Sequence, residues 1–184
     1  MEGLLLRARA GELTAPWPRV QALTTRRLVL EPLRPEHARE LAPVLDDDAL
    51  HAFIGGEPAS EAELRARFTR QAEGQSPDGA QGWLNWVARD SETRAPVGTV
   101  QATISDADGR RSAELAWVIA TTRQGEGLAT EAAGAVMDWL RDDGVTRFVA
   151  HIHPDHAASA AVARRLGLVA TEERHEGEVR WVGE

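Results

Sequence analysis

The sequence predicts a mixed α/β fold, in which helices cover a sheet that is largely antiparallel in its N-terminal half. Two observations lead to this class. Residues 83–119 contain three strand-like runs separated by turn residues, as antiparallel hairpins do. Residues 113–166 then show the pattern of a strand, a glycine-containing loop, a helix, a strand and a second helix, which is an α/β unit. Together these halves predict a mixed sheet with helices on its faces.

The length of the chain fits one domain. It has 184 residues, of which 42% are hydrophobic and 27% are charged, an ordinary balance for a globular protein. We expect a single domain over residues 23–184, preceded by an N-terminal extension over residues 1–22 that Pro16 and Pro18 keep out of regular structure. Two arrangements of this extension stay open: it drapes onto the domain through Trp17, or it forms a loose tail.

Strands are expected where apolar and β-branched residues run between turn signals. The first strand stops near Pro32, which has no N–H to donate to a ladder. The next two form a hairpin across residues 90–95, and a turn at residues 106–109 precedes the fourth. In chain order the expected strands are residues 27–33, 83–89, 96–104, 113–119, 147–152, 168–171 and 178–182.

Helices are expected where apolar residues recur at helical spacing. The first has Pro35 in its opening turn and ends at the acidic run Asp46–Asp48, which is interpreted as a solvated turn. Ser60 and Glu63 form a capping box for the second. The expected helices are residues 34–45, 60–68, 128–143 and 157–166, and residues 53–56 and 75–82 are expected to be loops.

Composition excludes several classes of protein. The chain has no cysteine, which rules out disulfide scaffolds, thiolate metal sites and cysteine nucleophiles. No apolar run approaches the roughly 18 residues of a membrane span, so no membrane partner is expected. The net charge of -8 argues against nucleic acid as a partner, because such binding needs a basic surface. We expect a cytoplasmic protein.

The chemically informative segment is residues 123–132, which read Arg-Gln-Gly-Glu-Gly-Leu-Ala-Thr-Glu-Ala. Gly125 and Gly127 precede a helix N-terminus, where unpaired amides and the helix dipole attract anions. The loop lacks the lysine of a nucleotide triphosphatase loop and the third glycine of a dinucleotide-binding loop. Two glycines alone indicate no more than a tight turn, so the residues around them decide the interpretation.

Those surrounding residues resemble the GNAT N-acetyltransferase superfamily. A Gln-x-x-Gly-x-Ala motif follows an apolar strand and opens a long helix, and a His-x-x-Ser motif follows the next strand. The run Leu-Thr-Thr-Arg-Arg-Leu-Val-Leu at residues 23–30 resembles the RimJ/RimL branch, which includes ribosomal-protein N-terminal acetyltransferases. The resemblance extends from residue 22 to the C-terminus. The residues that carry it are Glu114, Gln124, Gly127, Ala129, His156 and Ser159.

The resemblance implies a GNAT fold with a parallel strand pair, residues 113–119 and 147–152, that splays apart to admit acetyl-CoA. The pyrophosphate would lie on the loop of residues 124–130, and the pantetheine arm would pair with the main chain of residues 117–119. No metal is implied. The implied cofactor-binding residues are Trp117, Val118, Ile119, Gln124, Gly125, Glu126, Gly127, Leu128, Ala129, Thr130, His156 and Ser159.

Acetyl transfer to an amine needs a base for the ammonium and a donor for the developing oxyanion. The resemblance implies Glu114 as the catalytic base, whereas a solvent-facing or ion-paired role is the structural alternative for this residue. A main-chain N–H of Val118 or Ile119 is expected to stabilise the oxyanion. Competing acids lie near the C-terminal hairpin, namely Glu172, Glu173 and Glu176.

The residue that many GNAT enzymes use as the acid for the thiolate is missing. The chain has no tyrosine, and Ala163 stands at the matching position. Ser159 matches a serine of the RimJ/RimL branch near the sulfur, so we assign it to catalysis and cofactor binding, although it could instead bond to its own helix backbone. His156 stands where the family usually has asparagine, and it can titrate near neutral pH.

Two other classes of function compete with the enzyme. One is a coenzyme-A-binding sensor or scaffold without catalysis. The other is a metal site made by His151, His153 and His156 with Asp155, a donor set that suits zinc. The acetyltransferase frame needs no metal, and a strand end entering a turn explains the histidines as well.

The predicted function is therefore acetyl transfer from acetyl-CoA to a primary amine by direct attack. The acceptor stays open among a protein N-terminus, a small polyamine or amino acid, and an aminoglycoside-like compound. Acidic residues at Asp46–Asp48 and Glu57 weakly favour a cationic acceptor. A homodimer fits the branch, although no residue supports it.

Overall fold

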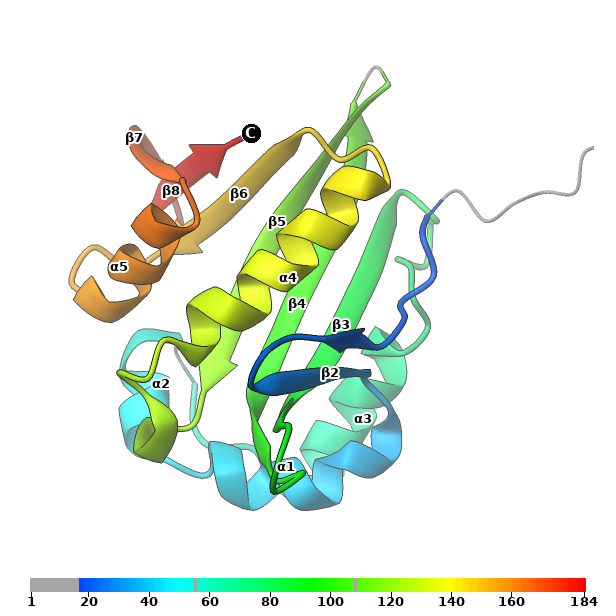
Figure 1. The fold of residues 1–184 in the computed structure, drawn as a ribbon, viewed down its shortest axis with the longest axis vertical. Coiled ribbons are helices and arrows are strands. Elements are labelled where there is room, and N and C mark those ends of the chain that lie inside the picture. Colours follow the sequence, from blue (N-terminus) through cyan, green and yellow to red (C-terminus); the bar gives the residue numbers. More distant parts are fainter. Residues whose placement is uncertain (1–16, 55, 108) are drawn as a thin grey trace, which may run out of the picture.

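The computed structural model describes residues 17–54, 56–107 and 109–184. Within them one sheet has eight strands in the order β1-β2-β3-β4-β5-β6-β8-β7, antiparallel except for the pair β5 and β6 (Figure 1). The elements are β1 (Leu23–Thr24), β2 (Leu28–Pro32), η1 (Pro35–His37), α1 (Ala38–Leu45), α2 (Asp48–Ile54), α3 (Glu61–Gln71), β3 (Gln81–Asp90), β4 (Pro96–Ala107), β5 (Arg110–Ile119), η2 (Thr121–Arg123), α4 (Leu128–Asp142), β6 (Arg147–Ile152), α5 (Ala157–Arg165), β7 (Val169–His175) and β8 (Glu178–Gly183).

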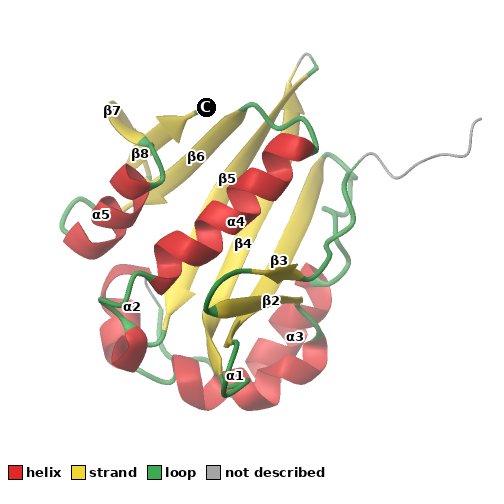
Figure 2. Ribbon diagram, viewed as in Figure 1, coloured by secondary structure: helices red, strands yellow, loops and turns green. Residues whose placement is uncertain are grey.

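The predicted mixed α/β architecture is confirmed, with one correction in the N-terminal half. Residues 48–54, expected as an acidic turn and the start of a loop, form the helix α2 (Figure 2). Asp47 explains the difference. One of its carboxylate oxygens accepts the Ala49 N–H at 2.9 Å, as an N-terminal cap does, and the other accepts the Thr121 hydroxyl. The acidic run therefore starts a helix and ties it to the segment after β5.

Helices cover both faces of the sheet. Helix α4 crosses the middle of one face, while α1 and α3 lie against the other (Figure 1). The main core lies under α4, where Ala132, Val136 and Leu140 are fully buried against the strands. A second cluster lies under α1 and α3, with Leu41, Leu64 and Phe68 at its centre. Each helix thus buries an apolar stripe against the sheet, which is the arrangement that positions the loops between them.

The last residues of the predicted extension lie against the domain. The Trp17 indole N–H donates to the Gly79 carbonyl at 3.1 Å, and its ring packs over Gly82, where a Cβ atom would come within 2.8 Å of it. Gly82 is therefore required by the close approach of the indole. Residues 1–16 lie outside the described part of the chain.

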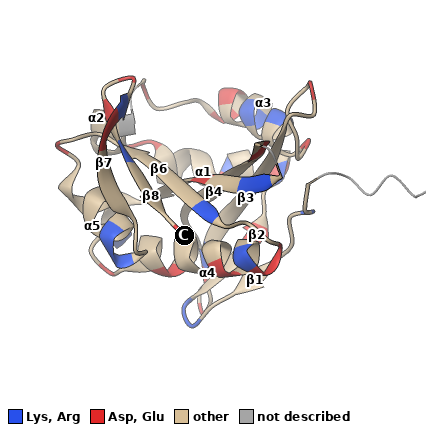
Figure 3. Ribbon diagram, turned by 90° about the horizontal axis from the view of Figure 1, so that it is seen from above, with Lys and Arg blue, Asp and Glu red and all other residues tan. Residues whose placement is uncertain are grey.

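Charged residues of both signs are spread over the molecule, with arginines gathered on α3 and α5 (Figure 3). No helix in the described residues is long and apolar enough to cross a membrane.

The parallel strands β5 and β6 pair over a short stretch and then separate. Their paired residues are Ser112 with Arg147, Ala113 with Phe148 and Glu114 with Val149. Beyond Glu114, β5 pairs only with β4, and β6 pairs with β8 along its length. The predicted splay is confirmed. It leaves a wedge between residues 115–119 of β5 and residues 150–152 of β6, with its narrow end at Glu114.

Candidate active site

The main chain of β5 alternates between its neighbour β4 and the open wedge. The Ala120 amide donates to the Val97 carbonyl at 2.9 Å, and Val118 lies opposite Thr99. Because hydrogen-bonded pairs alternate in an antiparallel ladder, the peptide groups of Val118 face β4, and those of Trp117 and Ile119 face the wedge. One wall of the wedge therefore consists of main-chain groups of β5 that no neighbouring strand pairs with. A slim extended ligand can pair with such an edge.

The loop after β5 presents the N-terminus of α4 to this wedge. Gly125 and Gly127 both have φ near +80°, in the left-handed region, and Gly127 caps the helix. The Gln124 side-chain amide donates to the Ile119 carbonyl at 2.9 Å, which fixes the loop to the strand end. The first amides of α4 consequently point out of the helix end, where an anion is stabilised by them and by the dipole.

Two arginines, Arg27 and Arg123, hold the loop in place. The Arg27 guanidinium donates to the Glu126 carbonyl at 2.9 Å and to the Glu131 carboxylate at 2.7 Å. Arg123 binds the carboxylates of Glu126 and Asp90 at 3.0–3.1 Å. Hydrogen bonds from the loop after Asp90 and from Arg123 lower the pKa of Asp90 to about 2, so the pair is charged over the whole working range. These contacts fix the loop before any ligand arrives.

A cavity of about 310 Å³ opens between the loop, the wedge and α5, and we call it the wedge cavity. It is lined by eleven of the twelve cofactor residues expected from the sequence; Glu126, whose carboxylate pairs with Arg123, is the exception. The lining includes Trp117, Val118, Ile119, Gln124, Gly125, Gly127, Leu128, Ala129, Thr130, His156 and Ser159. Eight residues that sequence reasoning missed also line it, namely Ala49, Leu50, Phe53, Arg123, Ala158, Ala161, Val162 and Arg165.

The wedge cavity fits coenzyme A on two independent counts. The Thr130 hydroxyl is buried and has no hydrogen-bond partner in the described residues, although a buried hydroxyl normally has one. It lies in the first turn of α4, where a phosphate oxygen would accept its hydrogen bond. A Cβ placed on Gly125 would meet no atom within 4 Å, so the loop leaves open space beside its amides. Arg165 also lines this cavity.

His156 has a packing role as well as a place in the wedge cavity. Its ring stacks on Phe53 of α2, and burial, followed by the charge of His153, lowers its pKa below the usual histidine value. Ser159 is half-buried one turn further along α5 and lines the same cavity. Of the three histidines of the suggested metal cluster, His151 binds Glu114, His153 lies 3.9 Å from Asp155, and His153 and His156 both contact the ring of Phe53. Among the described residues there is no group of three metal-binding side chains.

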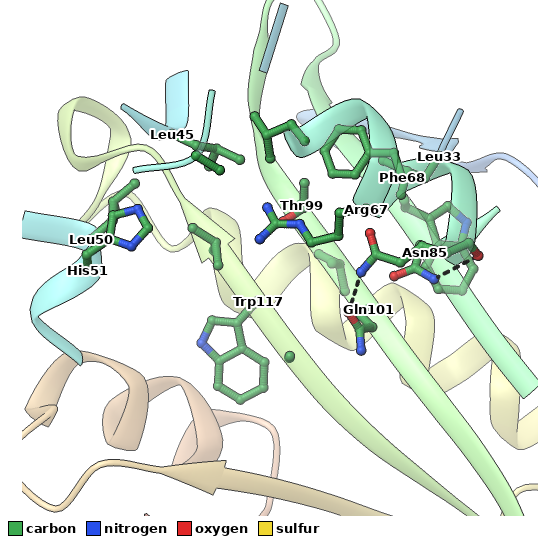
Figure 4. A pocket seen from close by; sticks show the side chains of 17 residues that line it. Leu33, Leu45, Leu50, His51, Arg67, Phe68, Asn85, Thr99, Gln101 and Trp117 are labelled. Atoms are coloured by element: carbon green, nitrogen blue, oxygen red, sulfur yellow. Dashed lines mark hydrogen bonds between the residues drawn. The ribbon is translucent and has the colours of Figure 1, made fainter. Parts of the chain in front are cut away.

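A second cavity, of about 330 Å³, lies on the other side of β5 under α1, α2 and α3, and we call it the helix-side cavity (Figure 4). It shares Leu50, Trp117 and Val118 with the wedge cavity, so the two meet near the C-terminal end of β5. Its remaining walls are Leu33, Leu45, His51, Ala59, Leu64, Arg67, Phe68, Gln71, Asn85, Trp86, Thr99, Val100, Gln101 and Ala116. Two ligands can therefore bind from opposite sides and touch at the strand.

Glu114 lies at the narrow end of the wedge and lines neither cavity. It shares a face of β5 with Ala116 and Val118, which do line the helix-side cavity. Its carboxylate is about half exposed and lies 3.1 Å from Nδ1 of His151. Of the competing C-terminal glutamates, Glu173 pairs with Arg180 on the last hairpin.

Comparison with known proteins identifies the fold and the family. Residues 27–169 match the family described as an acetyltransferase (GNAT) domain. The chain belongs to the GNAT acetyltransferase family. It is an acyltransferase, and acetyl-CoA is its acyl donor, as the fit of the wedge cavity indicates. A search of curated protein sequences gave no match.

Several solved structures share this GNAT fold. An acetyltransferase from Agrobacterium tumefaciens str. C58 is 24% identical, with a TM-score of 0.69 over 91% of this chain and 96% of that one. The ribosomal L7/L12 N-protein acetyltransferase RimL with coenzyme A is 18% identical, with a TM-score of 0.72 over 89% and 97%. The aminoglycoside acetyltransferase AAC(6')-Ib with coenzyme A is 15% identical, with a TM-score of 0.69 over 85% and 94%.

Proposed function

We propose that this GNAT enzyme transfers the acetyl group of acetyl-CoA directly to a small primary amine bound in the helix-side cavity. The observation that carries the proposal is the meeting of the two cavities at Leu50, Trp117 and Val118. Acetyl-CoA supplies an activated acetyl group. The amine nitrogen forms the new bond to the acetyl carbon, the carbon–sulfur bond breaks, and the amine proton passes to a base.

Glu114 is the proposed base, and it acts through ordered water. It lies on the acceptor-facing side of β5, and Val118, where the two cavities meet, is four residues further along the strand, a separation of about 13 Å. That span is too long for direct transfer or for a single bridging water, so the proton passes along a short chain of waters. His151 holds the carboxylate in place through the 3.1 Å contact, so it is a positioning residue in this scheme.

Main-chain amides of β5 are the proposed donors to the developing oxyanion. Of the two expected from the sequence, the N–H of Ile119 faces the wedge and that of Val118 faces β4. The N–H of Trp117, which also faces the wedge, joins Ile119 as a candidate. Ser159 is proposed to bind the cofactor near the sulfur and to supply a proton to the leaving thiolate, in the absence of a tyrosine.

The function is tested on one sample of purified protein. Calorimetry measures acetyl-CoA binding, and a thiol-release assay with a panel of amines measures turnover. Binding together with amine-dependent thiol release supports the proposal. Binding with no release above the rate of hydrolysis, across amino acids, peptides, polyamines and aminoglycosides, overturns catalysis by direct transfer.

A further inference from the structure

The charge inside the helix-side cavity is opposite to the charge of the whole protein. The chain carries a net charge of -8, but no Asp or Glu lines this cavity. Arg67 is the one arginine among its lining residues, and Figure 4 shows its guanidinium pointing into the cavity beside Thr99. An acceptor with several positive charges would find no carboxylate here to pair with.

Arg67 occupies a position on α3 where an apolar residue is expected. Leu64, Arg67, Phe68 and Gln71 follow one another at the spacing of a single helix face, and all four line the cavity. The outward arginine Arg65, by contrast, pairs with Glu61 one turn away at 3.2 Å. A charged residue on the inward stripe departs from the pattern of the helix, and such departures are typical of binding sites.

No carboxylate compensates this charge. In the described part of the chain Arg67 takes part in no hydrogen bond or ion pair, and its guanidinium lies 5.8 Å from the ring centroid of its neighbour Phe68. Solvent still reaches the side chain, and partial desolvation, followed by repulsion from Arg70, lowers the pKa of Arg67. The guanidinium remains protonated at neutral pH, so it has unused donors suited to a carboxylate.

Three other polar residues of the cavity, Gln71, Gln101 and Asn85, are already bonded to one another. Gln71 donates from its side-chain amide to Gln101 at 3.2 Å, and Asn85 donates to the Gln71 carbonyl at 3.4 Å. The surrounding walls are apolar, with Leu33, Leu45 and Trp86 among them. A volume of about 330 Å³ is at the lower end for ligand sites and suits a molecule the size of an amino acid.

We propose that the acceptor is a free amino acid with an apolar side chain, and that Arg67 binds its carboxylate while its amine faces β5. The proposal rests on the proposed function, because it takes the helix-side cavity as the acceptor site. The acidic run at Asp46–Asp48 does not oppose it, since Asp47 is engaged by Ala49 and Thr121. A polycation and a long peptide are the acceptors that this cavity suits least.

The test compares amino acids with their amides, and kcat/KM is referred to the neutral amine because the amide also lowers the pKa of the α-amine. Leucine, methionine and phenylalanine are assayed beside their amides, with a short peptide, spermidine and an aminoglycoside as further acceptors. We expect kcat/KM to be about 10- to 100-fold higher for at least one amino acid than for its amide. Equal or better turnover of the amides, the peptide or the polycations across the panel overturns the inference and leaves acetyl transfer intact.

Two variants locate the effect. Arg67→Gln should abolish the preference for the acid over the amide and leave acetyl-CoA affinity unchanged. Arg70→Gln, one turn along α3 and outside the cavity, should leave both unchanged. Calorimetry of the same amino acids with coenzyme-A-saturated protein gives a readout without turnover. If the amino acids bind in a way that depends on Arg67 but are not acetylated, the proposed function is refuted and the carboxylate site is supported. If they are acetylated and Arg67→Gln keeps the preference for the acid over the amide, the carboxylate site is refuted.

Discussion

The imidazole ring of His156 stacks on the phenyl ring of Phe53, with centroids 4.3 Å apart and planes 12° from parallel. This contact joins α5, on the donor side, to α2, which lines both cavities. The residue that departs from the usual asparagine of the family therefore holds together two elements that are distant in sequence.

Acid should weaken the fold through this histidine. Because the pKa of His156 is lowered by burial and by His153, its contribution to stability is present above the unfolded-state value of about 6.5. That contribution is lost as the pH falls below this value toward the folded pKa. The melting temperature should be lower at pH 5.5 than at pH 7.5, and His156→Gln should make this difference smaller. Burial also lowers the pKa of His37, which accounts for the pH dependence that remains in the variant. An unchanged pH dependence in His156→Gln contradicts the assignment.

Thr130→Val should change stability and cofactor affinity in opposite directions. The valine removes a buried hydroxyl that has no partner, so the free protein should gain about 0.5–1 kcal/mol in free energy of unfolding. The same change removes a donor from the first turn of α4, and the acetyl-CoA dissociation constant should rise about tenfold. Denaturant titration and calorimetry measure the two effects. An unchanged dissociation constant shows that the hydroxyl does not reach the ligand.

Glu131→Gln should loosen the support of the cofactor loop. The Glu131 carboxylate accepts from the Thr25 hydroxyl at 2.6 Å, the Arg27 amide at 2.8 Å and the Arg27 guanidinium at 2.7 Å. Loss of these charge-assisted bonds should cost about 1–3 kcal/mol in free energy of unfolding. The control is Asp138→Asn, which breaks an exposed ion pair with Arg141 on the same helix and should cost under about 0.5 kcal/mol.

The lowered pKa of Glu131 determines how acid changes the free energy of unfolding. Burial alone would raise the pKa of Glu131, but the hydrogen bonds from Thr25 and Arg27 outweigh it and lower the pKa below the ordinary value. The stabilisation is therefore complete above about pH 4.5 and is lost as the pH falls further. In Glu131→Gln the free energy of unfolding should fall less steeply as the pH drops through that acidic range. An equally steep fall in both proteins contradicts the assignment.

Glu114→Gln should lower kcat by about 10²–10⁴ while acetyl-CoA affinity stays nearly constant, because the amide cannot accept the amine proton. Steady-state kinetics and calorimetry separate these quantities. Glu173→Gln, on the last hairpin, is the matched control and should retain full activity. If the Glu114 variant keeps full kcat, another group is the base. His51, which lines the helix-side cavity, is then the next residue to test.

The gathering of the expected cofactor residues around one cavity could be predicted from sequence because its signals are local. The glycine spacing, the helix after Gly127 and the strand before Gln124 lie within a short segment, and the wedge cavity contains most of the residues expected there. Helix α2 could not be predicted in this way. Its seven residues are too few for a periodic pattern, and the capping role of Asp47 is hidden inside an acidic run.

The acceptor half depends on contacts between distant segments. Leu33, Arg67, Thr99 and Trp117 come from four parts of the chain and meet in one cavity. The acidic residues at Asp46–Asp48 and Glu57 weakly favoured a cationic acceptor, whereas the proposed acceptor cavity is lined by Arg67 and by no acidic residue. The position of Arg67 on one helix face with Leu64 and Phe68 is the local signal from which the proposed role could have been inferred.

The separation of β5 from β6 also bears on solubility. An open strand edge normally invites another protein chain to pair with it and aggregate. Here the open edge lies inside the molecule, between strands that converge at Glu114 and beside α4, α5 and the glycine loop. The fold thus keeps an edge available for pairing while shielding it from the chains that would make it a liability.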